Sequence, residues 1–428
     1  MKELIPPITT SAGATDATGA PGEMGAMGEK SAKGALSGLK VIDLSRVLGG
    51  PFCAQTLADH GAQVIKVEPP QGDETRAWGP PFNDTGLAAY YLGVNRNKQG
   101  MVIDLSSVEG REIVLRLLED ADVLIENFKI GTLERWGLGY EEVLRARFPR
   151  LIHCRVSGFG ADGPLGGAPG YDAVAQAMSG LMSINGSPES GATRIGVPIV
   201  DLATGLSATI GVLLALAERN RSGAGQFVDA TLYDTAIALL HPHASNWFIS
   251  GNSPRRSGNA HPNIVPYDKY PTRTCEVFLG IGNNGQFRKF CAYLGKPELA
   301  TDHRFMDNSD RIVNRTVLRE LLEAELSHVD GHVLCENLIA AGVPAGPVLS
   351  IPEVLTHPHT LHREMAITTA TYTGTGIPLK LSRTPGNITS PSPAFGEHTR
   401  EILEAHGYDA NEVQALLDEG VVIAAPVV

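Results

Sequence analysis

The sequence lacks the cysteine pattern of a disulfide-bonded or zinc-binding protein. Its five cysteines are odd in number, lie far apart and form no C-x-x-C pair: Cys53, Cys154, Cys275, Cys291 and Cys335. Neither a disulfide framework nor a metal site is therefore expected. Scattered thiols of this kind are typical of a reducing compartment, so we expect the protein in the cytoplasm.

The chain also lacks an excess of positive charge. Its formal net charge is -12 and its pI is about 5.6. Nucleic acids and anionic membranes require a basic surface, so neither is expected as a general partner. An anionic ligand would need a local basic pocket.

Long hydrophobic runs are missing too. The most apolar helical stretch, residues 210–217, is followed at once by the polar residues 218–221, so we expect a core helix too short to span a membrane. Residues 1–38 are rich in Gly, Ala, Thr and Ser and contain no Arg or signal-peptide core. They are expected to form a disordered leader.

With 428 residues, 43% of them hydrophobic and 19% charged, the chain is long enough for two domains. From residue 39 short β-rich runs alternate with helical patterns. The expected strands are 40–44, 64–67, 101–105, 123–125 and 151–156, and the expected helices are 49–58, 108–120 and 131–147. This alternation predicts an α/β fold with a parallel, doubly wound sheet and ligand contacts at the carboxyl ends of the strands.

The first strand-to-helix turn does not match a dinucleotide-binding motif. Residues 45–51 read SRVLGGP and lack the G-x-G-x-x-G spacing that seats a pyrophosphate on a helix N-terminus. The Walker motif G-x-x-x-x-G-K-[ST] is absent from the chain. An NAD enzyme is therefore a minor alternative, and phosphoryl transfer loses its main support.

Asp201 stands at the head of the apolar stretch 202–217. A carboxylate at this place has two uses. It can cap the helix, because Asp oxygens accept hydrogen bonds from free backbone N–H groups. It can also act as a nucleophile toward an activated acyl group. The residues alone leave both uses open.

Eight short motifs occur along the chain in a characteristic order. They are 45–51 SRVLGGP, 67–76 VEPPQGDETR, 95–98 NRNK, 125–128 IENF, 157–160 SGFG, 170–172 GYD, 197–201 VPIVD and 342–348 GVPAGPV. In this order they resemble the class III CoA-transferases, the family that includes formyl-CoA transferase, crotonobetainyl-CoA transferase and the 2-methylacyl-CoA racemases. The resemblance extends from Leu39 to the end of the chain.

The resemblance implies a Rossmann-like large domain built from both chain ends, a smaller inserted α+β domain, and a homodimer of interlocked subunits. On this basis we expect a leader at 1–38, the first part of the large domain at 39–235, a linker at 236–257, the small domain at 258–341 and the return to the large domain at 342–428. A composition rich in Gly, Ser, Asn and Pro at 251–263 supports a linker there.

The resemblance also implies that Asp201 is the nucleophile of a CoA-transferase. Its carboxylate would form a mixed anhydride and then an aspartyl-CoA thioester, and CoA would pass between short or dicarboxylic acids without ATP. Acyl-CoA would be a substrate, with no permanently bound cofactor. Backbone N–H groups at the helix start are expected to keep Asp201 ionised.

Tyr171 separates two branches of this family. The racemases carry a His at this position, which works with the matching Asp to exchange the α-proton. Tyr, with a pKa of about 10, is a poor replacement for His in that role. A 2-methylacyl-CoA racemase or epimerase is therefore the alternative, and a non-catalytic acyl-CoA-binding protein is the third possibility. Simple packing is the other use of the Tyr171 ring.

Further site residues follow from the resemblance. CoA contacts are expected at Val47, Leu48, Gly49, Ile103, Leu105, Ser106, Asn127, Phe128, Lys129 and Arg135, the last as a phosphate ligand or else as an exposed helix charge. Leu48 and Pro69 stand where formyl-CoA transferase has Gln and Arg, which argues against formyl and oxalyl substrates.

Residues 257–263 look like a shortened form of the family's glycine-rich loop, which closes over the intermediates. The substrate pocket and loop are therefore expected to comprise Tyr171, Gly258, Asn259, Ala260 and His261. His261 would contact a substrate carboxylate or be an ordinary loop residue. The adjacent Arg255 and Arg256 would attract an acidic acceptor or form an exposed charge pair.

Overall fold

The computed structural model describes residues 33–426. Most of the expected leader, residues 1–32, lies outside these. The last residues of the expected leader form a turn at 35–38, in which the Leu36 N–H donates to the His60 carbonyl at 2.9 Å. That end of the segment is therefore tied to the folded domain.

The larger sheet has seven strands in the order β12-β3-β2-β1-β4-β5-β6. Six strands are parallel and β12 alone is antiparallel. The strands are β1 Lys40–Asp43, β2 Gln63–Glu68, β3 Lys98–Ile103, β4 Val123–Glu126, β5 Ile152–Ser157, β6 Phe227–Thr231 and β12 Val422–Ile423. The chain leaves β1 toward β2 on one side and β4 lies on the other, so a crevice is expected at the carboxyl ends of these strands. The parallel sheet expected from the sequence is confirmed.

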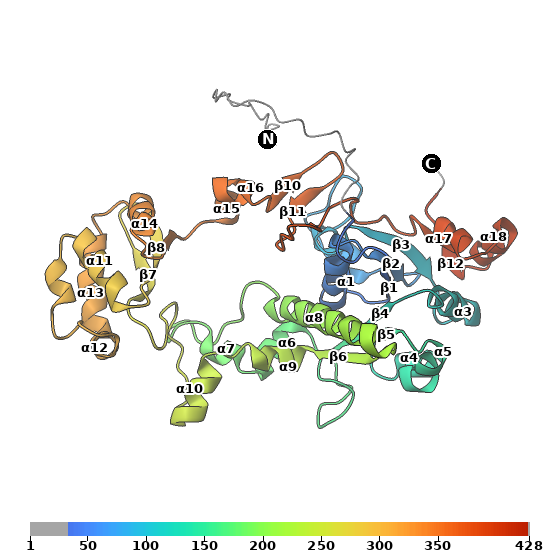
Figure 1. Cartoon of the computed structure of the whole chain (residues 1–428), viewed down its shortest axis with the longest axis horizontal. Helices are drawn as coiled ribbons and strands as arrows, with labels where there is room; N and C mark the ends of the chain where they lie inside the picture. The colour runs from blue at the N-terminus through green and yellow to red at the C-terminus, as the bar shows by residue number, and fades with distance from the viewer. Residues whose placement is uncertain (1–32, 427–428) are drawn as a thin grey trace. The chain divides into compact units, whose positions relative to one another are not determined.

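Both faces of this sheet are covered (Figure 1). Val41 and Val64 enter a core formed with α1 Gly49–Asp59 and α8 Ile199–Ser222. Their neighbours Ile42 and Ile65 enter the opposite core. That core includes side chains of α3 Val108–Leu117, α17 Thr399–Ala405 and α18 Ala410–Asp418. Alternate strand residues point to opposite faces, and both faces are apolar because both are buried.

The α8 helix is longer than the sequence predicted. It continues through the polar residues 218–221 to Ser222 and ends at Gly223, whose φ is 79°. Arg219 is buried there and donates to Asp122 Oδ1 at 2.8 Å, so its charge is compensated inside the fold. By length and composition α8 could cross a membrane, but it packs against α1, β5 and β6 as a core helix does.

The prediction of a single helix at 131–147 is wrong. The structure contains α4 Thr132–Arg135, a π-helical turn Tyr140–Leu144 and α5 Arg145–Arg147. Gly137 lies between α4 and the π-helical turn with φ 69°, a conformation that interrupts a right-handed helix. The periodicity alone did not reveal this break.

A second, antiparallel sheet has the order β7-β8-β9 and its own apolar core. Its strands are β7 Tyr267–Pro271, β8 Glu276–Gly280 and β9 Ala345–Pro347, and its helices are α11 Asn284–Tyr293, α12 Asn308–Val313, α13 Arg315–Leu326 and α14 Gly331–Ala340, with a 3-10 turn at Pro297–Ala300. This α+β unit includes β9, which lies beyond residue 341. The expected linker 236–257 contains the end of α9 Leu232–Ala238 and all of α10 His243–Ser250.

The remaining elements are short. They are a 3-10 turn at Glu74–Ala77, α2 Ala89–Leu92, α6 Asp172–Met178, α7 Leu181–Ile184, α15 Ile351–Thr356, α16 Pro358–His362, and the hairpin β10 Ala366–Thr368 with β11 Thr373–Thr375. Two of these elements, α2 and α6, bring side chains close to the start of α8.

Candidate active site

A cavity of about 280 Å³ opens at the carboxyl ends of β1, β4 and β5. The loops after these strands supply its walls: residues 46–49 after β1, 127–130 after β4, and 157–158 with 167–171 after β5. Glu74, Val156, Asp201 and Leu232 complete the lining. We call this space the Asp201 cavity. It lies where the strand order of the sheet predicts a ligand site.

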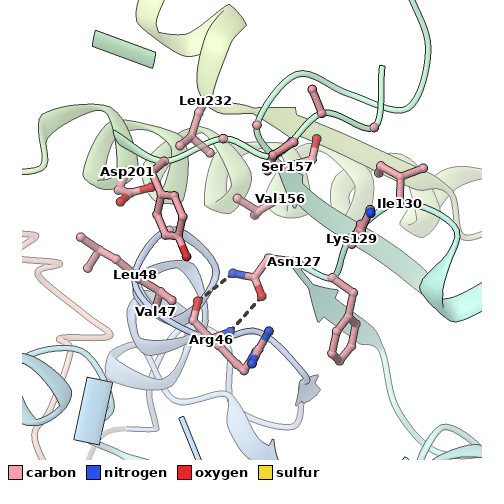
Figure 2. A pocket seen from close by; sticks show the side chains of 18 of the residues that line it. Arg46, Val47, Leu48, Asn127, Lys129, Ile130, Val156, Ser157, Asp201 and Leu232 are labelled. Carbon is pink, nitrogen blue, oxygen red and sulfur yellow. Dashed lines mark hydrogen bonds between the residues drawn. The ribbon is translucent and has the colours of Figure 1, made fainter. Parts of the chain in front are cut away.

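Figure 2 shows how the labelled side chains lie around this cavity. Asp201 and Leu48 lie toward one end, and Lys129 and Ile130 lie toward the other. Asn127 fixes the loop between them, because its Oδ1 accepts from the Arg46 N–H at 2.9 Å and its Nδ2 donates to the Arg46 carbonyl at 2.7 Å. These two hydrogen bonds join the loops that follow β1 and β4.

Asp201 is the third residue of α8 and does not cap it. Pro198 occupies the cap position, and among the described residues the Asp201 carboxylate accepts no hydrogen bond. Burial, together with the charge of Asp172, raises the pKa of Asp201 to about 7. The capping role, and the expectation that N–H groups keep this carboxylate ionised, are therefore wrong.

Asp172 caps the helix in its place. Its Oδ2 accepts from the N–H of Val200 at 2.8 Å and from the N–H of Asp201 at 3.2 Å. Gln176 donates to Asp172 Oδ1 at 2.6 Å and accepts from the Ile195 N–H at 2.8 Å. Both side chains are buried, so α6 fixes the chain that enters α8 and the direction of the Asp201 side chain.

The start of α1 packs directly against Asp201. A Cβ atom on Gly49 would lie 3.4 Å from the Asp201 carbonyl oxygen and 3.9 Å from its Oδ1. A side chain at this position would therefore crowd the carboxylate. The partial positive charge of a helix N-terminus suits anions at this place.

A buried ionic network supports the loop after β1. Lys66 Nζ donates to Asp73 Oδ2 at 2.9 Å and to the Ser45 carbonyl at 3.0 Å, with both side chains of the ion pair fully buried. Asp73 Oδ1 accepts from the Val47 N–H at 3.4 Å. Val47 has φ 70°, a strained conformation for a β-branched residue. The network therefore helps to hold a strained turn in the wall of the Asp201 cavity.

A second cavity of about 410 Å³ adjoins the first. The two share Arg46, Phe128 and Lys129, and the second continues along the ends of β2 and β3 to Leu105 and Ser106. Eight of the ten expected CoA contacts therefore line these two adjoining cavities. Six line the Asp201 cavity, namely Val47, Leu48, Gly49, Asn127, Phe128 and Lys129. Leu105 and Ser106 line the second cavity, together with Phe128 and Lys129.

Other expected residues lie elsewhere. The Ile103 side chain is fully buried in the core and lines neither cavity. Arg135 is exposed and donates to Thr132 Oγ1 at 3.0 Å, next to the second cavity rather than in its lining. Tyr171 lines the Asp201 cavity with more than half of its side chain exposed. Of the expected loop, Ala260 and His261 line a separate hollow, and Gly258 and Asn259 line none of these three spaces.

Sequence reasoning missed two residues. Arg46 belongs to a quoted motif but was not assigned a role, although it lines both cavities. Tyr90 on α2 is close enough to Asp201 for their charges to interact: burial raises the pKa of Tyr90 to about 12, and the charges of Asp201, Asp172 and Asp73 add to this rise. Its hydroxyl therefore stays protonated. Nothing in the local sequence around Tyr90 indicates this proximity.

The arrangement is suited to acyl chemistry on a carboxylate. A desolvated carboxyl group with a pKa of about 7 is partly ionised at neutral pH. Once ionised, it is a carboxylate with no hydrogen-bond donors among the described residues to weaken it as a nucleophile. The adjoining second cavity leaves room for the remainder of an elongated ligand.

Comparison with known proteins agrees with this geometry. Residues 36–399 match CoA-transferase family III. The chain is 42% identical to the succinate–glutarate CoA-transferase of Agrobacterium fabrum over 86% of this chain and 94% of that protein. It is 40% identical to the acetyl-CoA:oxalate CoA-transferase of Acetobacter aceti over 81% and 88% of the two chains. A crystal structure of a CAIB/BAIF family protein from Brucella suis is similar with a TM-score of 0.79 and 43% identity, over 87% of this chain and all of that one.

Proposed function

The chain belongs to CoA-transferase family III and is an enzyme of that class, and we propose that it moves CoA between an acyl-CoA and a free dicarboxylic acid with Asp201 as the nucleophile. The observation that carries this proposal is the position of Asp201, a partly buried carboxyl group whose pKa is raised to about 7, in the wall of a cavity at the carboxyl edge of the sheet.

The reaction proceeds through two kinds of covalent intermediate. The Asp201 carboxylate attacks the thioester carbonyl, the C–S bond breaks, and a mixed anhydride and CoA thiolate form. The thiolate attacks the Asp201 side-chain carbonyl, giving an aspartyl-CoA thioester and releasing the donor acid as its carboxylate. The acceptor carboxylate then attacks this thioester, and the same two steps in reverse give the new acyl-CoA and free Asp201.

Charge develops on oxygen in each of these steps. The N-terminus of α1 at Gly49 packs against Asp201, so its partial positive charge stabilises the oxyanions. Arg46 and Lys129, which line both cavities, are suited to hold the phosphate groups of CoA at the far end.

The acceptor acid is proposed to be a dicarboxylate. This follows from the relatives, whose names specify glutarate and oxalate as substrates of those proteins. Leu48 in the cavity wall argues against oxalate, because the two carboxylates of this acid are adjacent and both would lie beside an apolar side chain that offers no hydrogen bond. A longer acid holds its second carboxylate further away. We therefore expect four- and five-carbon acids to be preferred over oxalate.

A racemase requires an acid or base on each face of the α-carbon. None of the described residues that line the Asp201 cavity is a histidine, and Tyr171 is present where the racemases have one. This supports transfer over racemisation. Exchange of the α-proton of a 2-methylacyl-CoA for deuterium, without any acceptor acid, would favour the racemase instead.

We also propose that the enzyme is a homodimer. The face of α8 that points away from the sheet exposes Leu206, Ile210, Leu213 and Leu214, which lie on one stripe of the helix. Three further apolar side chains are exposed on α10, namely Trp247, Phe248 and Ile249. An apolar surface of this extent is typical of a subunit interface.

Trapping tests the covalent mechanism. The protein is incubated with succinyl-CoA and hydroxylamine, and a hydroxamate is expected on the peptide that carries Asp201. Asp201→Ala is expected to lose transfer activity about a thousandfold or more. Asp162→Asn, which removes an exposed carboxylate outside the cavity, is the matched control and should keep full activity. An unmodified Asp201 together with an active Asp201→Ala enzyme would refute the mechanism.

A further inference from the structure

A third space, which we call the basic hollow, lies between α10 and residues 252–262 that follow it. It has a volume of about 500 Å³ and shares no lining residue with the Asp201 cavity. Its walls carry Arg255, Arg256, Arg315, His243, His261 and Asn246, and none of the described residues that line it is an Asp or Glu. An acid-free hollow is unusual in a chain with a net charge of -12.

The three arginines of the hollow form no ion pair with the described residues. Among residues 33–426, none of Arg255, Arg256 and Arg315 has a carboxylate oxygen within 4.0 Å, whereas nearby Arg304 and Arg319 each pair with an Asp. Arg256 Nε is buried and has no hydrogen-bond partner among the described residues. Three guanidinium groups around one hollow repel each other unless an anion joins them, and guanidinium groups bind carboxylates with two hydrogen bonds.

The walls are held in place before any ligand arrives. Arg315, the first residue of α13, donates to the carbonyl oxygens of His261 at 2.9 Å and Pro262 at 3.4 Å. Arg256 Nη1 donates to the Ser183 carbonyl at 3.3 Å, and the Gly258 N–H donates to the Gly186 carbonyl at 3.0 Å. The hollow is therefore supported from α13 on one side and from residues 183–186 on the other.

The surroundings favour the neutral form of both histidines of the hollow. Burial lowers the pKa of both His243 and His261, and the charge of Arg315 lowers that of His261 further. His261 Nδ1 accepts from the Asn263 N–H at 3.0 Å, which leaves Nε2 as the protonated nitrogen. The arginines thus supply the charge, and His261 supplies an oriented N–H.

We propose that the basic hollow binds a compact dicarboxylate. Its lining contains no Phe, Tyr or Trp on which an adenine could stack, so a small acid fits it better than the nucleotide of CoA. The choice of a dicarboxylate rests on the proposed function, in which such acids are substrates, but the binding of an anion does not. Because the hollow is separate from the Asp201 cavity, binding there requires neither acyl-CoA nor Asp201.

Calorimetric titration of the full chain with glutarate, in the absence of CoA, tests this site. The double variant Arg255→Gln/Arg256→Gln is expected to bind about tenfold more weakly or worse, since a charge-assisted hydrogen bond is worth about 1.5–3 kcal/mol. Arg288→Gln on the exposed face of α11 makes the same change of charge and should bind as the unmodified chain does. Unaltered affinity in the double variant, or no binding by the unmodified chain, would overturn the proposal.

Two further arms identify the ligand and separate this inference from the proposed function. Butyrate, with one carboxylate, should bind more weakly than glutarate. Adenosine 3′,5′-bisphosphate carries the phosphates of CoA, and arginine-dependent binding of this compound but not of glutarate would overturn the dicarboxylate assignment. Asp201→Ala should bind glutarate normally. If it does, while Asp201 resists trapping by hydroxylamine, only the proposed mechanism fails; trapping without glutarate binding refutes only the basic hollow.

Discussion

Asp172 Oδ2 accepts a hydrogen bond from the backbone N–H of Asp201 at 3.2 Å. One carboxylate therefore caps the helix that carries the other. This frees the Asp201 side chain to face the cavity and places a second negative charge close to it. Burial, together with this charge, raises the pKa of Asp201 to about 7.

The rate of enzyme acylation should therefore depend on pH near neutrality. In the proposed mechanism only ionised Asp201 attacks, so kcat/KM for succinyl-CoA is expected to rise with pH through an apparent pKa of about 7 and then level off. Asp172→Asn removes one of the two causes of the raised pKa, so the rise should move to lower pH. Asp162→Asn serves as the control with an unchanged profile. A flat profile between pH 5 and pH 8 would contradict the environment described for Asp201.

Asp201 should also cost the protein stability at high pH. Its pKa is higher in the folded chain than the usual value of 3.8, so the unfolded state ionises first as the pH rises. The cost is absent below about pH 4, grows between pH 4 and 7 and is complete above pH 7. Asp201→Asn should thus raise the free energy of unfolding by about 1–3 kcal/mol at pH 8 and by little at pH 4. Urea titrations at both pH values measure the difference; equal effects at the two pH values would be inconsistent with it.

The close packing of α1 on α8 predicts the effect of a methyl group at Gly205. A Cβ atom there would lie 2.7 Å from the Gly49 carbonyl and 3.1 Å from Phe52 Cδ1, so α1 must move. Gly205→Ala is expected to destabilise the protein by about 1–3 kcal/mol and to lower kcat, because Gly49 also packs against Asp201. Gly196→Ala is the matched control, since no atom lies within 4 Å of its Cβ position. Thermal unfolding and steady-state kinetics of both variants test this prediction, and equal stability and kcat in the two variants would contradict it.

The buried pair of Lys66 and Asp73 should be costly to break. Both side chains are fully buried at 2.9 Å, so Lys66→Met leaves an uncompensated carboxylate and should cost about 3–5 kcal/mol. Lys66→Met/Asp73→Asn should recover part of this loss. The exposed pair of Arg145 and Glu141 is the comparison, and Glu141→Gln should change the stability by about 0.5 kcal/mol or less. Similar losses at the two pairs, measured by urea unfolding, would show that the network is not as buried as described.

The thiols should differ strongly in reactivity. Burial raises the pKa of Cys53 and of Cys291 to about 12 and that of Cys335 to about 11, and it also raises the pKa of the buried Cys154. Cys275 is the one thiol with an intermediate exposure. Since only the thiolate reacts, a disulfide reagent should modify Cys275 in the native protein and all five cysteines after denaturation. Cys275→Ser should abolish the native reaction; rapid labelling of Cys53 would contradict its burial.

Much of the fold followed from local pattern. Alternating β-rich and helical runs predicted the first five parallel strands to within a few residues, because strands buried on both faces are almost wholly apolar. The strands β6 and β12 were not predicted. β12 has two residues and pairs antiparallel with β3, about 320 positions earlier in the chain, so its partner is visible only in the folded structure.

The candidate site, like the fold, was predicted only in part. Ordered motifs in the sequence identified the family, Asp201 and the loops after β1 and β4, because these loops are continuous in sequence. Contacts between distant segments were not predictable in this manner. Tyr90 approaches Asp201 from another element, and the arginines at 255–256 and 315 meet around one hollow.

The sequence by itself determined the family and the parallel sheet, and it singled out Asp201 as the candidate nucleophile. Only the tertiary structure decided the state of that residue. Whether Asp201 caps a helix, and at what pH it ionises, depends on which oxygen atoms reach the backbone N–H groups of α8 and how much water remains around the carboxylate. Asp172 caps α8, although it lies at the start of α6, 27 residues before α8 begins. Burial raises the pKa of Asp201. Hydrogen bonding and desolvation depend on which residues are neighbours in the folded structure, and the sequence pattern does not specify those neighbours.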